Sequence, residues 1–218
     1  MPPQHHISEQ ATHAERPWLL LLFAALGLAG CAALIAGTLI APLYVPDYNS
    51  ISDTISDLAA GQSEIIMDVA LYGFAAGIFA VALAASHAHL GGPWWTLGIL
   101  ALAVLASLVI VIGARNEYGD GDSDGVVIHI YLVYAMGALV PLTCGAMAPG
   151  LRASGHPKAR WALIVSGICW AVLAPIFLLS PTTIDGLLER IVGLTFCAAI
   201  AVLSWVFAAR GLAALRKD

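Results

Sequence analysis

The stretch Trp95–Ile112, WTLGILALAVLASLVIVI, runs for 18 residues without a charged side chain. A helix needs about 20 mostly apolar residues to cross roughly 30 Å of hydrocarbon, so this run is typical of a membrane span. Five other runs share its length and character. The six predicted spans are Trp18–Leu39, Ile65–Ser86, Trp95–Ile112, Val127–Met147, Trp161–Leu179 and Leu188–Ala208. The sequence therefore predicts an all-α polytopic membrane protein, a bundle of six transmembrane helices.

The composition agrees with this fold class. The 218 residues are 60% hydrophobic and 11% charged, whereas about a quarter of the residues of a soluble domain are charged. The connections between spans are short and leave little room for a separate soluble domain. We expect one six-helix domain over residues 18–212, a polar and disordered cytoplasmic segment over 1–17 and a basic cytoplasmic tail over 213–218.

Basic residues set the predicted orientation, because cytoplasmic loops are enriched in Lys and Arg. With the N-terminus inside, seven of the nine basic residues are cytoplasmic, and only Arg115 and Arg190 lie outside. We therefore expect both termini in the cytoplasm of a bacterial or archaeal cell. Most acidic residues fall on the outer side, and the net charge of −5 without a basic patch argues against nucleic-acid binding. The four cysteines fall within predicted spans, where we expect unpaired, buried thiols.

The first outer loop, Tyr48–Leu58, has the sequence YNSISDTISDL. Ile51, Ile55 and Leu58 recur at helical spacing, which predicts a short amphipathic helix over the outer surface. Ser50 would be its N-cap, and Asp53 would lie in its first turn. In the functional interpretation, Ser56 and Asp57 project into a polar site between the spans. In the structural one, the hydroxyls and carboxylates of this loop cap helices and bind backbone.

Several ionisable residues share the depth of this loop, and such groups usually turn inward and pair near hydrocarbon. His129 enters the fourth span and could act as a general base if Asp57 orients it. We accordingly name Asp57, His129 and Ser56 as candidate catalytic residues. The candidate ligand-binding residues are Ser52, Asp53, Asp68, Arg115, Glu117, Glu189 and Arg190. The alternatives are structural ion pairs around the two arginines, an anion site made by them, and a histidine with only an interfacial role.

The loop before the fourth span carries Asp120, Asp122 and Asp124, with glycine at position 125. This run is similar to the opening of a calcium-binding loop, but Tyr131 stands where the bidentate glutamate is required. Weak binding of a divalent cation is the most that these three carboxylates predict. No other cofactor is predicted.

Together these motifs resemble a known family. They are the Tyr48–Leu58 loop, an Arg-Asn-Glu turn at 115–117, the sequence Ile128-His129-Ile130-Tyr131, and the pair Glu189-Arg190. The chain resembles, over residues 20–212, the bacterial and archaeal integral membrane proteins grouped as domain of unknown function 998. The resemblance implies a six-helix bundle with polar residues gathered at the outer side, and implies no reaction. The positions that match the family pattern are Ser52, Ser56, Asp57, His129 and Arg190.

The hypothesis that we favour is a membrane protein with an outward-facing polar site that binds or acts on a lipid or small amphiphile. One alternative is a non-enzymatic structural or accessory subunit of a larger membrane complex. The small-residue pattern at Gly73 and Gly77 would favour such a partner or a homo-oligomer, although a neighbouring helix of the same chain is the more common use. A small-molecule transporter is the second alternative. It is weakened because no broken-helix pair is visible.

Overall fold

The computed structural model describes residues 15–59, 64–114 and 129–216. Within these ranges the chain is helical and contains no strand. The elements in chain order are α1 (Pro17–Ile40), the 3₁₀-helix η1 (Ala41–Tyr44), α2 (Ile55–Leu58), α3 (Glu64–Ala88), α4 (Pro93–Ala114), α5 (His129–Ala153), α6 (Pro157–Leu178) and α7 (Asp185–Leu215). Six of the described helices, all except α2, are long and apolar enough to cross a membrane. The predicted fold class and the six predicted spans are confirmed.

The helix boundaries follow from local chemistry. Three helices begin with a proline at their first position, Pro17, Pro93 and Pro157. Proline suits this position because its ring fixes a helical φ and its missing N–H would have no partner there. The last helix is longer than the predicted span. Its 31 residues correspond to about 46 Å, so α7 continues beyond a hydrocarbon layer of about 30 Å.

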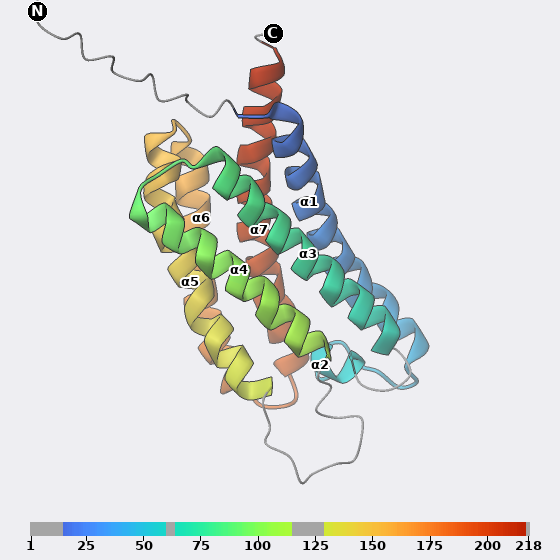
Figure 1. The fold of residues 1–218 in the computed structure, drawn as a ribbon. Helices are drawn as coiled ribbons and strands as arrows, with labels where there is room; N and C mark the ends of the chain where they lie inside the picture. The colour runs from blue at the N-terminus through green and yellow to red at the C-terminus, as the bar shows by residue number, and fades with distance from the viewer. Residues whose placement is uncertain (1–14, 60–63, 115–128, 217–218) are drawn as a thin grey trace, which may run out of the picture.

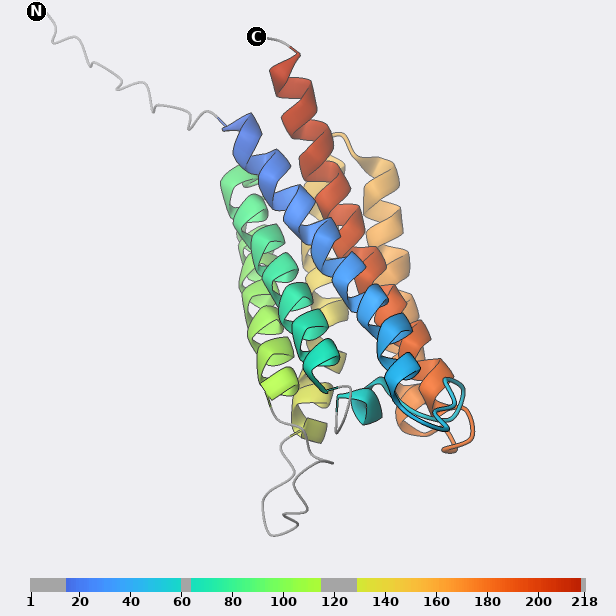
Figure 2. The same ribbon diagram turned by 90° about the vertical axis from the view of Figure 1, so that its right-hand side faces the viewer.

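The six long helices form a closed ring. Each packs against its neighbours in the order α1, α3, α4, α5, α6, α7, and α7 packs again on α1. Figures 1 and 2 show the consecutive long helices running in alternating directions, with the start of α1 and the end of α7 at the same end of the bundle. We call this the terminal end and the opposite one, which carries α2, the α2 end. Six crossings place both chain ends on one side, as the sequence predicted.

Glycines bring α1 and α3 together. A Cβ on Gly30 of α1 would lie 2.8 Å from the Gly73 carbonyl oxygen and 2.9 Å from the Gly77 Cα. Neither helix could approach so closely with larger residues at these positions. The small-residue pattern at Gly73 and Gly77 is therefore used by a neighbouring helix of the same chain.

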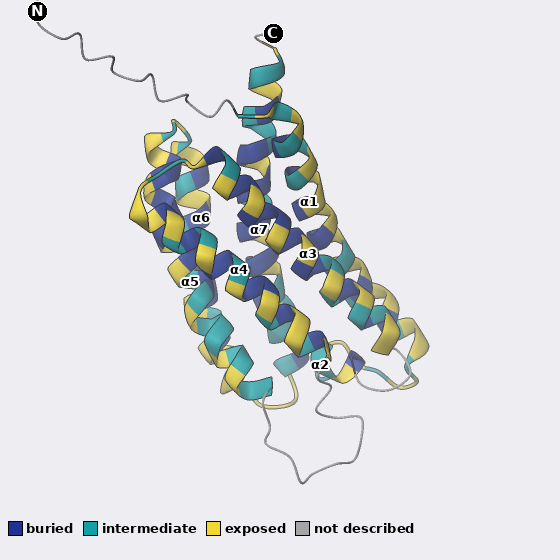
Figure 3. Cartoon of the chain, viewed as in Figure 1, coloured by how far each residue is buried: buried dark blue, intermediate teal, exposed yellow. Residues whose placement is uncertain are grey.

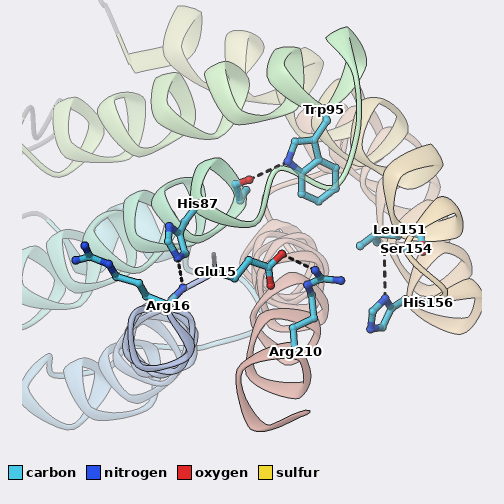
Figure 4. Close-up of polar contacts among 9 residues, drawn as sticks. Glu15, Arg16, His87, Trp95, Leu151, Ser154, His156 and Arg210 are labelled. Carbon is cyan, nitrogen blue, oxygen red and sulfur yellow. Dashed lines mark hydrogen bonds and ion pairs between the residues drawn. The ribbon is translucent and has the colours of Figure 1, made fainter. Parts of the chain in front are cut away.

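Polar contacts tie the helices together at the terminal end (Figure 4). Arg210 of α7 pairs with Glu15, and the Arg16 backbone N–H donates to His87 Nε2 of α3 over 2.7 Å. The Trp95 indole N–H of α4 donates to the Ala85 carbonyl over 2.9 Å. Glu15 and Arg16, which the sequence placed in a polar tail, are thus held against the bundle. Residues 1–14 and 217–218 of the two expected tails lie outside the described residues, whereas residues 213–215 belong to α7.

The interior of the ring is mostly apolar, with Thr143, Ser166 and Ser204 as its buried polar residues among those described. Every long helix carries buried residues (Figure 3). Cys31, Cys144 and Cys197 are buried there and Cys169 is partly buried, and all four thiols are free. The half of α5 nearer the α2 end is the exception to this packing. No residue from His129 to Leu139 is buried, and burial begins at Val140. This difference between the two halves of α5 determines where the candidate site lies.

Candidate functional site

The first loop folds through its own short polar side chains. The Asn49 carbonyl oxygen Oδ1 accepts the Ile51 N–H at 3.0 Å. The Asp53 carboxylate accepts the Asn49 N–H and the Ser52 hydroxyl, each at 2.8 Å. The Asn49 N–H, and after it the Ser52 hydroxyl, lower the pKa of Asp53 below its ordinary value because both bonds favour the charged form. Ser52 and Asp53, predicted as ligand-binding residues, therefore hold the shape of the loop.

The helix in this loop begins later than the sequence predicted. The prediction that Ser50 is the N-cap is wrong. Residues 50–53 form turns, and α2 begins at Ile55 with Thr54 as its N-cap. Thr54 Oγ1 accepts the Asp57 N–H at 3.1 Å, and Asp57 Oδ2 accepts the Thr54 N–H at 2.7 Å. This reciprocal pair is a capping box. The Asp57 carboxylate is engaged at the start of its own helix.

Glu189 of α7 completes the cap of α2. Its carboxylate accepts the backbone N–H of Ile55 through Oε2 and the hydroxyl of Ser56 through Oε1, the latter at 3.1 Å. The first N–H groups of a helix have no partner within the helix, and they favour a negative charge. Glu189 thus attaches α2 to α7 across more than 130 residues of sequence.

Arg190 binds the turn that precedes α2. Its guanidinium donates to the carbonyl oxygens of Ser50 at 3.1 Å and Asp53 at 2.9 Å, and to that of Gly186 in its own helix at 2.8 Å. It also donates to the Tyr48 hydroxyl and lies 5.5 Å from the centre of the Tyr48 ring. The partners of Arg190 in the described structure are thus carbonyls and a phenol, and neither the expected ion pair nor an anion site is formed by these contacts.

Tyr48 contacts both the Arg190 guanidinium and the turn that Arg190 binds. Its hydroxyl lies 2.9 Å from the Asp53 carbonyl oxygen and 2.8 Å from that of Thr54, so it donates to the same turn. Burial raises the pKa of this phenol above its ordinary value, and the Arg190 guanidinium partly offsets that shift. Tyr48 therefore remains a neutral donor at ordinary pH.

The start of α7 lies directly against the loop. The Leu187 N–H donates to the Ile51 carbonyl over 3.0 Å. A Cβ on Gly186 would lie 2.1 Å from the Asp53 carbonyl oxygen, a distance that no side chain can tolerate. We call this assembly, Tyr48–Asp57 against Gly186–Arg190, the loop–α7 junction. It fixes α2 over the interior of the bundle at the α2 end.

A cavity of about 600 Å³ lies beneath the loop–α7 junction. All six long helices contribute to its wall, most of which is apolar. Its polar lining residues are Thr54, Ser56, His129, Tyr134, Trp170, Ser180, Asp185 and Glu189. Most of these belong to α2, to the loop between α6 and α7, or to helix ends at the α2 end. The cavity therefore has a polar end under α2 and an apolar body within the membrane-spanning region.

Two glycines leave room for this cavity. Gly137 of α5 and Gly193 of α7 both line it, and a Cβ at either position would meet nothing within 4 Å. Trp170 of α6 and the edge-packed ring of Phe196, 5.5 Å away, form part of the deeper wall. Gly137 and Gly193 are partly buried and border unfilled space, whereas the buried glycines of the described chain are tightly packed.

The structure brings some of the predicted site residues together and separates others. Ser56, His129 and Glu189 line the cavity, whereas Ser52, Asp53, Asp57 and Arg190 stabilise the loop above it. Asp68 lies near the start of α3, and its buried Oδ1 has no hydrogen-bond partner in the described part of the chain. The remaining predicted residues lie outside the described residues; they are Arg115, Glu117, Asp120, Asp122 and Asp124. Among the described residues, no group of three or more His, Cys, Asp or Glu side chains could hold a metal ion.

Sequence reasoning missed much of the cavity wall. Asp185, Ser180 and Thr54 carried a usable signal, because each is a polar residue flanking a predicted span at the correct depth. Trp170, Met136 and Phe74 carried none, because an apolar side chain facing a cavity has the same sequence pattern as one that packs in a core.

Comparison with known proteins adds one finding. A family model described as "Protein of unknown function (DUF998)" matches residues 28–206, which confirms the family resemblance drawn from the residues. No curated protein and no solved structure matches the chain significantly.

Proposed function

Because the chain belongs to the DUF998 family and has six helices suited to crossing a membrane, we propose that it is an integral membrane protein that binds a lipid or small amphiphile in the cavity beneath α2. The observation that carries the proposal is the cavity itself. Its volume of about 600 Å³ falls in the range of ligand sites, roughly 300–1,000 Å³. Its apolar body and polar end match the two parts of an amphiphile.

The polar end favours a particular kind of head group. Hydroxyls of Thr54, Ser56 and Ser180 and the carboxylates of Asp185 and Glu189 line it, and the described lining includes no Lys or Arg. Arg190, the described cation at this end, donates to backbone carbonyls instead. A head group that carries hydrogen-bond donors therefore suits this end better than a phosphate or carboxylate.

We propose binding as the function of this cavity. Ser56 and His129 both line it, and the Asp57 carboxylate accepts the N–H and the hydroxyl of Thr54. The Gly73 and Gly77 motif, on which an accessory subunit would depend, is occupied by α1. The lipid-binding hypothesis is thus supported by the cavity, a feature that an accessory subunit does not require.

The basic residues support a location for the site outside the cytoplasm. The described cations at the terminal end are Arg16, Arg152, Lys158, Arg160, Arg210 and Arg216, against Arg190 alone at the α2 end. Cytoplasmic loops are the more basic ones. We therefore place the terminal end in the cytoplasm and the polar end of the cavity at the opposite membrane face.

Filling the cavity tests the proposal. Gly137→Leu and Gly193→Leu place a side chain in the open space, whereas Gly145→Leu adds the same side chain to an exposed position of α5 that does not line the cavity. Native mass spectrometry of protein purified from its host membrane measures the lipid that remains bound. We expect a lipid adduct on the natural protein and on Gly145→Leu, and its loss from both cavity variants.

The proposed function is wrong if the natural protein carries no adduct, or if both cavity variants retain it fully. A thermal unfolding midpoint in detergent, measured for all three variants, separates loss of the lipid from loss of the fold. The mass of the adduct also identifies the head group. A phosphate-only head would contradict the preference for donor-bearing groups while leaving the cavity as the binding site.

A further inference from the structure

On one side the cavity is bordered by α5 and α6. At their inner contact, α5 and α6 are tightly packed, because a Cβ on Gly167 would lie 2.7 Å from the Cys144 Cβ and 3.7 Å from the Pro141 Cα. One turn closer to the α2 end, a Cβ on Gly137 would meet nothing within 4 Å. Pro141 lies between these two regions, and proline inside a helix commonly kinks it. Tight packing beside Pro141 therefore gives way to open space beside Gly137, towards the α2 end.

The lining residues of the cavity differ in burial from one helix to another. On α1, α3 and α7 its apolar lining residues Leu34, Phe74 and Phe196 are buried. On α6 the lining residues Trp170 and Ala174 are buried as well. Three others, Ala171, Pro175 and Leu178, are exposed, and they share one helical face because they are four and three residues apart. Opposite them, Tyr134 of α5 lines the cavity while 53% of its surface is exposed. The cavity is therefore incompletely closed between α5 and α6.

This gap, rimmed by Tyr134, Gly137, Ala171, Pro175 and Leu178, lies between two membrane-crossing helices. Its rim is apolar except for the Tyr134 hydroxyl, and the polar lining groups gather under α2. In a bilayer, such a gap faces lipid chains and not water. A molecule that already resides in the membrane can therefore reach the cavity without leaving hydrocarbon.

We propose that the cavity opens sideways into the bilayer between α5 and α6, and that its occupant is the acyl chain of a lipid from the leaflet at the α2 end. This rests on the proposed function and narrows its ligand class from amphiphiles in general to lipids resident in the membrane. The acyl chain enters the apolar body through the gap, and the head group stays near the hydroxyls and carboxylates under α2. A water-borne amphiphile, which would have to enter from the polar end, is the competing occupant.

Tryptophan fluorescence can test this access route, because Trp170 lines the cavity but is only 4% exposed. The protein is prepared with Trp170 as its single tryptophan, the other five being replaced by Phe, and reconstituted into vesicles of phosphatidylcholine brominated in its acyl chains. A bromine atom quenches the fluorescence of an indole ring when the two come close together. We expect Trp170 to lose most of its emission, as strongly as the 57% exposed Trp205 examined alone.

The matched control is Trp95 as the single tryptophan. It is 1% exposed, lies outside the cavity wall, and should keep its emission in the same vesicles.

A second pair of variants tests whether acyl chains pass through the gap between α5 and α6. Ala171→Phe, made with Trp170 as the only tryptophan, adds bulk at the rim and should restore the emission. Val172→Phe, the exposed neighbouring position outside the cavity wall, should leave the quenching unchanged.

Two results would overturn sideways access. Trp170 quenched no more than Trp95 would mean that acyl chains do not enter. Equal quenching in Ala171→Phe and Val172→Phe would mean that bromine acts from the surrounding bilayer. If lateral access fails while the lipid adduct is still lost on filling Gly137 and Gly193, the proposed function stands and the ligand enters from the polar end. Should the single-tryptophan proteins not fold, the difference in quenching between the natural protein and Trp170→Phe gives the same measurement.

Discussion

Glu189 and Arg190 are adjacent in the chain and bind opposite kinds of backbone group. Glu189 accepts the N–H of Ile55 at the start of α2, while Arg190 donates to the carbonyls of Ser50 and Asp53 in the preceding turn. The first N–H groups of a helix and the carbonyls of an irregular turn both lack partners in regular structure. One short segment of α7 therefore satisfies donors and acceptors of the same loop.

Gly186 should be among the least replaceable residues of this contact. Gly186→Ala would force a Cβ against the Asp53 carbonyl oxygen, because the two atoms would lie only 2.1 Å apart. We expect a loss of about 1–3 kcal/mol, typical of overpacking, seen as a lower thermal unfolding midpoint in detergent. Gly193→Ala is the matched control in the same helix. Its Cβ meets nothing within 4 Å, so the midpoint should be unchanged or rise by the helix propensity of alanine. Equal midpoints for the two variants would refute the close approach.

At the scale of the element, α2 is too short to be stable alone. It contains four residues, whereas isolated helices of fewer than about 12 residues are marginal in water. Its stability therefore comes from the capping box of Thr54 and Asp57 and from Glu189 of α7. Removing the bond to α7 should loosen α2 without unfolding the membrane helices.

Glu189→Ala tests this dependence. The variant leaves the Ile55 N–H without its acceptor, and a buried donor left without a partner costs about 1–3 kcal/mol. Hydrogen exchange at Ile55–Leu58 should therefore accelerate by about tenfold, while α1 and α3 keep their protection. Glu189→Gln keeps one acceptor oxygen and should give an intermediate rate. Asp185→Asn, at another polar cavity residue whose carboxylate accepts the Gly186 N–H, should leave exchange in α2 unchanged. Natural exchange rates in Glu189→Ala would contradict a role for Glu189 in holding α2.

The N-cap of α2 marks a limit of local sequence reasoning. Ser50 with Asp53 and Thr54 with Asp57 have the same spacing, and both pairs suit a capping box. The second pair is used because Arg190 and Tyr48 hold residues 50–53 in a turn, and these contacts join positions about 140 residues apart. The long spans were predictable because each depends only on its own apolar run. The cavity was not, since it depends on how far α5 stands from α6.

At the scale of the whole molecule, the ring closes through α1 and α7, which carry the two ends of the chain (Figure 2). The ion pair of Glu15 with Arg210 joins the segment just before α1 to α7 at the terminal end. The same end carries most of the described cations, and the α2 end carries the polar part of the cavity. The orientation of the bundle therefore decides which side of the membrane meets the site.

Thiol labelling in intact cells can determine this orientation. Thr182→Cys places a thiol in the exposed loop between α6 and α7 at the α2 end, and Lys158→Cys places one at the exposed start of α6 at the terminal end. An impermeant maleimide should label Thr182→Cys directly, and Lys158→Cys only after permeabilisation. The natural cysteines give the background, which should be low because they lie within the spans and three are buried. Reversed labelling would place the α2 end in the cytoplasm.

The contacts of Arg190 have an evolutionary consequence. Its guanidinium binds the main-chain oxygens of Ser50, Asp53 and Gly186, and every amino acid supplies such an oxygen. Selection on the contact between Arg190 and the loop therefore keeps the position of the main chain and not the identity of the side chains. Among related proteins, Ser50 and Ile51 are free to diverge, provided that an arginine and a glycine persist at 190 and 186.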